Sequence, residues 1–187
     1  MILEKMIDNR ACYTRVHVVK AMLLMENRCS REKLMSDLKL NEAPTKTLLN
    51  RLRKNKFVES TTKGHKLAKK GHDFLNFVRK NIYGPKDVGI SRITMSKYNI
   101  AYLVKGRADK IKLGIEQRDQ AIVFGADGMT SLVYKDKLLI PGMRWTVPKW
   151  MENIFTLEEN DVILIGSAGD KVTADLAALN SAIALII

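Results

Sequence analysis

The 187-residue chain is poor in the features that define several specialised classes of protein. Two cysteines are too few for a disulfide framework, and four prolines with eleven glycines exclude a collagen-like or Pro/Gly-rich disordered chain. No apolar run approaches the roughly 18 residues that a membrane-spanning helix requires. The beginning of the chain also lacks the pattern of a signal peptide. We therefore expect a cytoplasmic protein with no membrane partner.

Positive charge is concentrated in the first half of the chain. The formal net charge at pH 7 is +12. Residues 1–86 contain 20 lysines and arginines against 8 acidic residues, whereas residues 87–187 contain 12 of each. The pattern predicts a basic module joined to a neutral one. Such an excess of one sign favours a polyanionic partner such as nucleic acid.

Helical periodicity and capping residues predict three helices before residue 57. Thr14 can cap a helix to about residue 27, Ser30 can cap a helix over 31–39, and a third helix to about residue 56 has Pro44 in its first turn. A short β-hairpin over 57–67 and a fourth helix over 69–81 follow. This order is typical of a winged helix-turn-helix domain, which we assign to residues 1–83.

Two strings in this half resemble archaeal winged-helix regulators over about residues 14–82. The string TLLNRLRKNKFV (47–58) resembles the end of a recognition helix that continues into the first wing strand. The string GHKLAKKG (64–71) resembles the passage from the wing to the last helix, although Ala68 stands where the family often has a capping threonine. The resemblance implies a DNA-binding transcriptional regulator.

The predicted third helix has a face suited to nucleic acid. At 100° per residue its leucines gather on one side, and cationic and amide side chains lie opposite or beside that face. Lysine and arginine can reach phosphates and guanine edges, and asparagine can bind adenine through two hydrogen bonds. We expect duplex DNA to contact nine residues of the helix and wing: Lys46, Thr47, Asn50, Arg51, Arg53, Lys54, Lys63, His65 and Lys66. A solvated basic face, or an adaptor that binds RNA or the ribosome, remains an alternative.

The second half is expected to be a separate α+β domain over residues 87–187, with the boundary at Tyr83–Lys86. A mostly antiparallel sheet is predicted from strands at 98–105, 129–134, 137–140 and 162–166, with another possible at 109–113. Residues 115–124 fit a helix, with a strand at 121–124 as the competing interpretation. Asp170 can cap a final helix.

Three strings in this half resemble the C-terminal domain of a little-characterised archaeal family of two-domain winged-helix proteins, regarded as regulators of transcription. They are GIEQRDQAI (114–122), GADG (125–128) and Pro141-Gly142. The resemblance implies the two-domain architecture and names no ligand.

Catalysis and metal binding have little support in the sequence. The second half contains neither histidine nor cysteine, and its acids, lysines and serines form no catalytic string. We expect no catalytic residues and no cofactor, with an enzyme based on Asp/Lys chemistry as an alternative. Cys12, His17 and Cys29 match no zinc-binding spacing, so we expect no metal site.

The second domain is expected to join two chains in a homodimer, to sense a small-molecule effector, or to do both. An arginine and two glycine-containing turns suggest the ligand site, because arginine grips carboxylates and the N–H groups at a helix start can hold an anion. Trp145 and Trp150 line a pocket or close the core. The turns can equally be plain connections. The candidate ligand residues are Arg118, Asp119, Gly125, Gly128, Gly166, Ser167 and Gly169.

Overall fold

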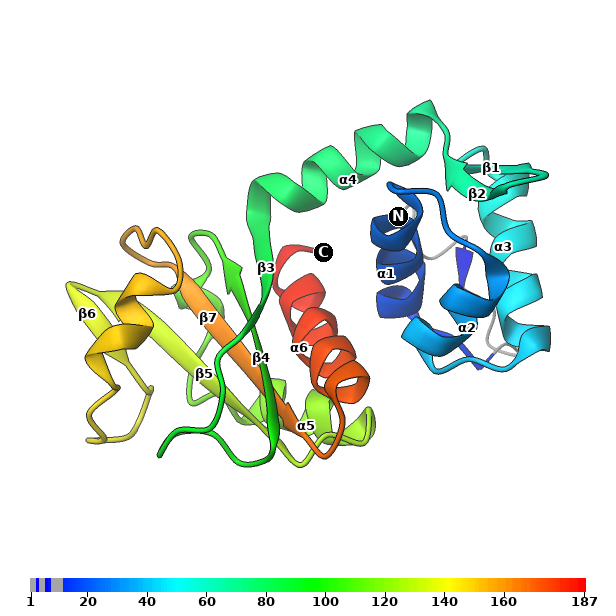
Figure 1. The fold of residues 1–187 in the computed structure, drawn as a ribbon. Helices are drawn as coiled ribbons and strands as arrows, with labels where there is room; N and C mark the ends of the chain where they lie inside the picture. The colour runs from blue at the N-terminus through cyan, green and yellow to red at the C-terminus, as the bar shows by residue number, and fades with distance from the viewer. Residues whose placement is uncertain (1–2, 4–5, 8–11) are drawn as a thin grey trace. The chain divides into compact units, whose positions relative to one another are not determined.

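The computed structural model describes residues 3, 6–7 and 12–187 and divides the chain into two compact units, Met1–Arg79 and Lys80–Ile187 (Figure 1). The first unit is mainly helical and the second is built on a five-stranded sheet. The protein is therefore an α+β protein with a mostly antiparallel sheet. No helix among the described residues has the length and apolar character needed to cross a membrane.

The first unit contains four helices and one hairpin. Its elements are α1 (Arg15–Met25), α2 (Arg31–Leu38), α3 (Glu42–Lys54), β1 (Val58–Thr61), β2 (Gly64–Leu67) and α4 (Lys69–Asn81). Ser30 caps α2 as predicted, because its Oγ accepts a hydrogen bond from the Lys33 N–H at 3.2 Å. The core is formed by side chains with no exposed surface, among them Val16, Met22, Leu34, Leu38, Leu52 and Leu75.

His17 and Thr14 form the capping box at the start of α1. The Thr14 N–H donates to His17 Nδ1 at 3.0 Å, and the Thr14 side chain lies within 3.2 Å of the same nitrogen. His17 is buried, and this burial lowers its pKa from 6.5 to about 4, although a hydrogen bond to the Leu38 backbone opposes the shift. The imidazole is therefore neutral at pH 7, with Nδ1 as the acceptor of the cap.

The second unit has a five-stranded sheet in the order β3-β4-β7-β5-β6, and every neighbouring pair is antiparallel. Its strands are β3 (Ile82–Asp87), β4 (Tyr98–Val104), β5 (Gly128–Lys135), β6 (Lys137–Leu139) and β7 (Val162–Ala168). The central strands β4 and β7 are buried almost throughout. Strands buried on both faces have near-continuous apolar runs, as these two do.

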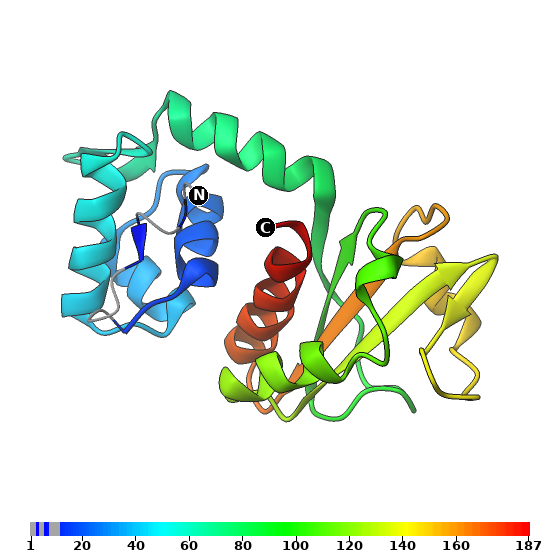
Figure 2. The same cartoon turned by 180° about the vertical axis from the view of Figure 1, so that it is seen from behind.

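Helices α5 (Ile115–Val123) and α6 (Lys171–Ile186) complete the second unit (Figure 2). α6 packs against β4 and β7, and α5 packs against β5 and α6. Asp170 caps α6 as predicted, with its Oδ1 accepting from the Thr173 N–H at 3.0 Å. A separate apolar cluster under the 3₁₀ helix η3 (Lys149–Asn153) includes Ile93, Leu103, Leu132, Met151, Phe155 and Ile163.

Two local predictions for this half are wrong. Residues 109–113 are not a strand: the chain turns through the 3₁₀ helix η2 (Ala108–Lys110), because the Lys110 N–H bonds the Arg107 carbonyl at 3.0 Å. Tyr83–Lys86 is not a linker but part of β3, in which Tyr83 pairs with Leu103 and Lys86 with Ala101. A bulge between these pairs accommodates the Gly-Pro step, and β3 is an edge strand, where proline is tolerated.

Candidate functional site

The outer face of α3 presents the side chains predicted to contact nucleic acid. Its inner face is buried at Thr45, Leu48, Leu49 and Leu52. The exposed residues are Lys46, Asn50, Arg53 and Lys54, while Thr47 is half-buried with its hydroxyl donating to the Ala43 carbonyl at 3.0 Å. The amphipathic pattern of the helix thus fixes one apolar face inward and leaves a cationic face in solvent.

Asn50 lies in the middle of this face with its amide oriented. Arg53 Nη2 donates to Asn50 Oδ1 at 3.0 Å. The amide nitrogen of Asn50 has no hydrogen-bond partner among the described residues, and a carbonyl oxygen has a second lone pair. Asn50 can therefore still offer one donor and one acceptor to a base edge.

The hairpin β1–β2 is held beside the first turn of α2. β1 and β2 pair from Val58–Leu67 to Thr61–Gly64, with Lys63 exposed at the turn. The backbones of His65 and Cys29 exchange two hydrogen bonds of 2.9 Å, which add the chain before α2 to the hairpin. The position of the hairpin is therefore fixed by backbone pairing.

His65 marks where the cations of this unit converge. Its ring nitrogen Nδ1 lies 3.0 Å from Ser60 Oγ. Burial lowers the pKa of His65, and the nearby charges of Arg31 and Arg53 lower it further. Arg31 at the start of α2 and Arg53 near the end of α3 therefore both lie near the hairpin. Arg31 is a cation that the sequence did not suggest here, because it lies outside the predicted third helix and wing, and it forms an exposed ion pair with Glu42 at 3.6 Å.

Arg51 and Lys66, which were also predicted to contact DNA, are both engaged within the protein. Arg51 is half-buried, and its Nη1 donates to the Ile7 carbonyl at 3.1 Å. Arg51 is therefore less accessible to DNA than Lys46 or Lys54, because its position on the helix directs it toward the segment before α1. Lys66 Nζ lies 3.1 Å from Glu59 Oε2 in a surface ion pair, with which a phosphate must compete.

The cysteines and histidines of the first unit are dispersed. Cys12 is exposed and Cys29 is buried, while His17 caps α1. Within the part of the chain that the structure describes, no three His, Cys, Asp or Glu side chains gather in a way that could hold a metal ion. Burial raises the pKa of the Cys29 thiol, so it is a protonated core side chain at neutral pH.

Two predicted ligand residues of the second unit are parts of its core. β7 extends to Ala168, so Gly166 and Ser167 lie in the strand rather than in a turn. A Cβ on Gly166 would lie 2.5 Å from the Ala174 carbonyl oxygen, so glycine is needed for the contact between β7 and α6. Ser167 Oγ donates to Asn99 Oδ1 at 2.7 Å. The prediction that these two residues belong to a turn is therefore wrong.

The remaining predicted ligand residues do not converge. Gly125 follows the end of α5, Gly128 is buried at the start of β5, and Gly169 is exposed before α6. Asp119 and Arg118 are adjacent on α5, and both are exposed. Of the seven residues, Arg118 alone lines a cavity of about 320 Å³ in the second unit.

Four parts of the chain form the walls of that cavity. Its lining comprises Arg92–Met95, Leu113–Ile115 with Arg118, Met129–Ser131, and Ile140, Met143 and Trp145. Trp145 therefore lines a pocket, as one of the two interpretations of the tryptophans had it, whereas Trp150 is not among the lining residues. Arg92 and Ser131 were missed because neither belongs to a motif. The one available signal was a hydroxyl pair, Thr130-Ser131, in an otherwise apolar strand.

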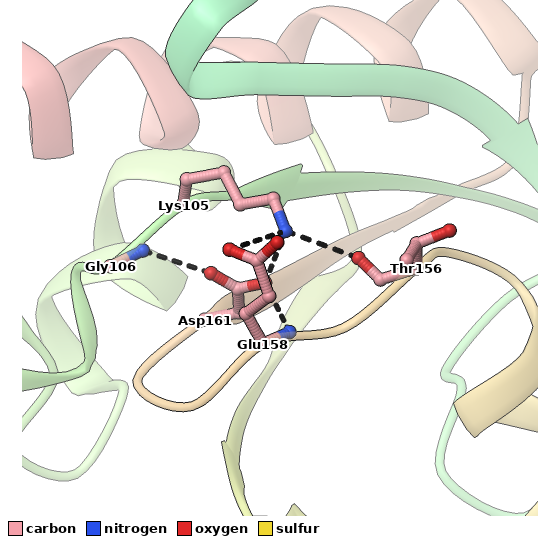
Figure 3. A network of polar contacts seen from close by, with 5 residues as sticks. All are labelled: Lys105, Gly106, Thr156, Glu158 and Asp161. Carbon is pink, nitrogen blue, oxygen red and sulfur yellow. Dashed lines mark hydrogen bonds and ion pairs between the residues drawn. The ribbon is translucent and has the colours of Figure 1, made fainter.

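A second polar cluster joins the end of β4 to the loop before β7 (Figure 3). Lys105 Nζ lies 2.9 Å from Asp161 Oδ2 and 3.4 Å from Glu158 Oε2, and it donates to the Thr156 carbonyl at 3.2 Å. The N–H groups of Gly106 and Glu158 donate to the two Asp161 oxygens at 3.0 and 2.8 Å. Both oxygens of the buried Asp161 carboxylate therefore accept hydrogen bonds.

The charge state of Lys105 supports a structural role for this cluster. Burial lowers the pKa of Lys105, but its bonds to Asp161 and Glu158 outweigh burial and raise the pKa above its usual value. A lysine that stays protonated at neutral pH is neither a base nor a nucleophile. The cluster therefore connects the chain after β4 to the loop before β7.

Fold and sites together define a two-unit α+β protein with a basic helical unit and a sheet unit that contains an apolar cavity. Residues 95–185 match the model of a family described as a domain of unknown function (DUF4443). The chain is also similar to a solved structure, hypothetical protein PH0730 from Pyrococcus horikoshii OT3, with a TM-score of 0.78, 27% identity and 92% of each chain covered. No curated protein matches the sequence. Neither description names an activity.

Proposed function

We propose that the protein is a DNA-binding regulator of transcription, whose first unit is a winged helix-turn-helix domain. In this proposal α2 and α3 are the helix-turn-helix, α3 enters the major groove, and the β1–β2 hairpin is the wing. The observation that carries it is the exposed face of α3, where Lys46, Asn50 and Lys54 lie beside Arg53. The order α1-α2-α3-β1-β2-α4 agrees with that domain type.

Charge supports nucleic acid over a purely protein-binding role. Residues 46–80 contain 11 lysines and arginines against two acids, Glu59 and Asp73. The exposed cations of α3 are joined by Lys63 at the hairpin turn and by Lys69 and Lys70 at the start of α4. A concentration of unpaired positive charge around one exposed helix is the electrostatic signature of a phosphate-binding surface.

The test is fluorescence anisotropy of a labelled DNA duplex titrated with the full chain at several salt concentrations. Each phosphate neutralised contributes about −0.9 to the slope of log K against log salt. The double change Lys46→Ala and Lys54→Ala should therefore weaken binding to every sequence and reduce the slope by up to roughly 1.8. The matched control, Lys135→Ala with Lys137→Ala, removes the same charge from exposed positions of the second unit and should leave both quantities unchanged.

The same titration with a structured RNA hairpin decides the nature of the polyanion. Preference for the duplex, lost in the Lys46/Lys54 variant and kept in the control, supports the proposal. Tighter binding of the RNA hairpin would replace it with the RNA-adaptor alternative. No duplex affinity even at low salt, or equal losses in both double variants, would contradict a DNA interface on α3.

We further propose that the second unit joins two chains in a homodimer. A single winged helix contacts one half-site, and DNA-binding regulators commonly pair two half-sites about one helical turn apart. Residues 87–187 carry equal numbers of basic and acidic residues, so two copies do not repel each other. Two copies of the basic first unit would repel each other.

A further inference from the structure

The cavity of the second unit lies against the outer edge of β5. β5 pairs with β7 over residues 128–133, but β6 covers only residues 133–135 on the other side. In the described part of the chain, no strand is paired to that outer edge over residues 128–132. Met129–Ser131 of this strand line the cavity. The cavity has a volume of about 320 Å³, which is within the range of small-molecule sites.

Ser131 supplies a buried polar group at the wall of this cavity. The residue is 4% exposed, and its Oγ is one of two buried side-chain polar atoms without a hydrogen-bond partner in the described residues. The other, Gln120 Oε1, belongs to a residue that does not line the cavity. Buried hydroxyls are normally hydrogen-bonded, so an unpartnered one at a cavity wall is a candidate donor to a ligand.

Gly114 packs closely against Ser131. A Cβ on Gly114 would lie 3.1 Å from both Cβ and Oγ of Ser131. Gly114 also has φ of +76°, a conformation that side-chain-bearing residues rarely adopt. Both observations favour glycine at this position, where it allows the start of α5 to approach Ser131 closely.

The same glycine is the N-cap of α5, a nine-residue helix whose first turn lies at the cavity. Gly114 has no side chain to bond the free N–H groups of that turn, and no side-chain cap is present. These groups and the positive end of the helix dipole favour a negative charge. Glu116, the acidic residue of the first turn, is exposed and does not line the cavity.

Two arginines complete the polar side of the site. Arg92 and Arg118 both line the cavity, and neither has an ion-pair partner among the described residues. The rest of the wall is mainly apolar and comes from Ile93, Leu113, Met129, Ile140, Met143 and Trp145. Cations alone suit any anion, but an apolar wall excludes a small, fully hydrated one such as inorganic phosphate.

We propose that this cavity binds an amphipathic carboxylate, an aliphatic or aromatic acid whose apolar body lies against Leu113, Met129 and Trp145. The carboxylate accepts hydrogen bonds from Ser131 Oγ, the first turn of α5 and the guanidinium of Arg118, with Arg92 adding charge at the opening. Arginine matches a carboxylate through two parallel N–H bonds. This site does not depend on the DNA-binding proposal, because every residue that forms it belongs to the second unit.

The experiment uses the full chain with octanoate as the probe. Octanamide is the neutral control of the same length, and acetate and inorganic phosphate are anions without an apolar body. Binding is followed by thermal shift and by tryptophan fluorescence of Trp150→Phe, in which Trp145 is the single remaining tryptophan. We expect saturable binding of octanoate, at least tenfold weaker binding of octanamide, and no saturation by acetate or phosphate up to roughly 10 mM.

Three variants locate the site. Arg118→Gln should weaken octanoate at least tenfold and bring its affinity close to that of octanamide, because the charge partner is lost. Ser131→Ala should weaken octanoate several-fold while the ligand-free protein melts no lower, since it removes an unsatisfied buried hydroxyl. Arg144→Gln, an exposed arginine outside the cavity lining, is the matched control and should bind as the unaltered chain does.

Several results would overturn the proposal. Octanoate that fails to bind, or octanamide that binds equally well, shows that the cavity does not select a carboxylate. Equal losses in Arg118→Gln and Arg144→Gln show that the effect is one of net charge. Octanoate that shifts the melting temperature without changing the fluorescence of Trp145 binds elsewhere.

Discussion

The ionisation of His17 is coupled to folding. It is buried at the first turn of α1, where its Nδ1 accepts the Thr14 N–H, and a protonated ring cannot accept that bond. Its pKa is lowered from 6.5 to about 4 mainly because burial removes the hydration of the charged ring. The unfolded chain therefore takes up this proton at a higher pH than the folded chain does.

We predict that this residue makes the protein less stable in mild acid. The contribution of His17 to the free energy of unfolding should be complete above pH 6.5 and should decrease as the pH falls toward about 4. A shift of this size corresponds to about 3 kcal/mol. Urea denaturation at several pH values measures it. His17→Gln keeps an acceptor at this capping-box position without titrating, so a pH dependence that survives unchanged in this variant would contradict the assignment.

We predict that substitution by alanine has different effects on stability at Gly166 and at Gly169. Gly166→Ala should destabilise the second unit by roughly 1–3 kcal/mol or more, because the new Cβ meets the Ala174 carbonyl oxygen of α6 at 2.5 Å. Gly169→Ala should be close to neutral, because no atom lies within 4 Å of its Cβ position. Thermal or urea unfolding compares the two. Equal losses would show that the β7–α6 contact is not the reason for glycine at 166.

At the scale of secondary structure elements, α3 combines two kinds of contact on one face. Lys46 and Lys54 are exposed cations, while Asn50 has an amide that Arg53 orients. Phosphate contacts contribute affinity that is independent of sequence, whereas base-edge contacts discriminate between sequences. The proposed role of α3 therefore makes different predictions for neighbouring positions of the same helix.

We predict that Asn50→Ala reduces discrimination between a preferred and a scrambled duplex by roughly 1–3 kcal/mol, with little change in the salt slope. Lys54→Ala should do the reverse, weakening both duplexes equally and reducing the slope by about 0.9. Duplexes selected from a random pool by the full chain supply the preferred sequence. An Asn50→Ala variant with unaltered discrimination would remove Asn50 from the base-contacting set.

At the scale of the whole molecule, we predict a homodimer. Light scattering of the full chain should give the mass of two chains at micromolar concentration, with and without duplex DNA. A monomer mass under both conditions would contradict the dimer, and the protein would then have to bind a single half-site. Because the measurement needs neither octanoate nor a specific duplex, its outcome is independent of both other proposals.

Much of the fold follows from local patterns in the sequence. The helices at 15–25, 31–38 and 42–54, the hairpin around Gly64, and the helix at 171–186 carry capping residues, helical periodicity or a turn between apolar runs. Those signals depend only on neighbours in the chain. The same holds for the cationic face of α3, because helical geometry alone places Lys46, Asn50 and Lys54 opposite the leucines.

The failures occur where long-range contacts override local signals. Tyr83–Lys86 has the glycine and proline typical of a domain boundary, yet it pairs with β4. It forms part of the edge strand of the sheet. Gly166 has the appearance of a turn glycine, but the approach of α6 to β7 is what requires it. Arg51 is directed to the Ile7 carbonyl, a group 44 residues earlier in the chain.

The cavity in the second unit depends still more on tertiary structure. Its walls come from Arg92–Met95, the start of α5, β5 and the segment around Trp145, which are separated by many residues in the sequence. No local pattern indicates that Ser131 is buried without a partner in the described residues or that two arginines line the same cavity. The sequence by itself determined the helices, the hairpin and the location of the charge, because these depend on neighbouring residues. Only the tertiary structure decided which polar groups converge, because convergence requires the sheet to bring distant segments together.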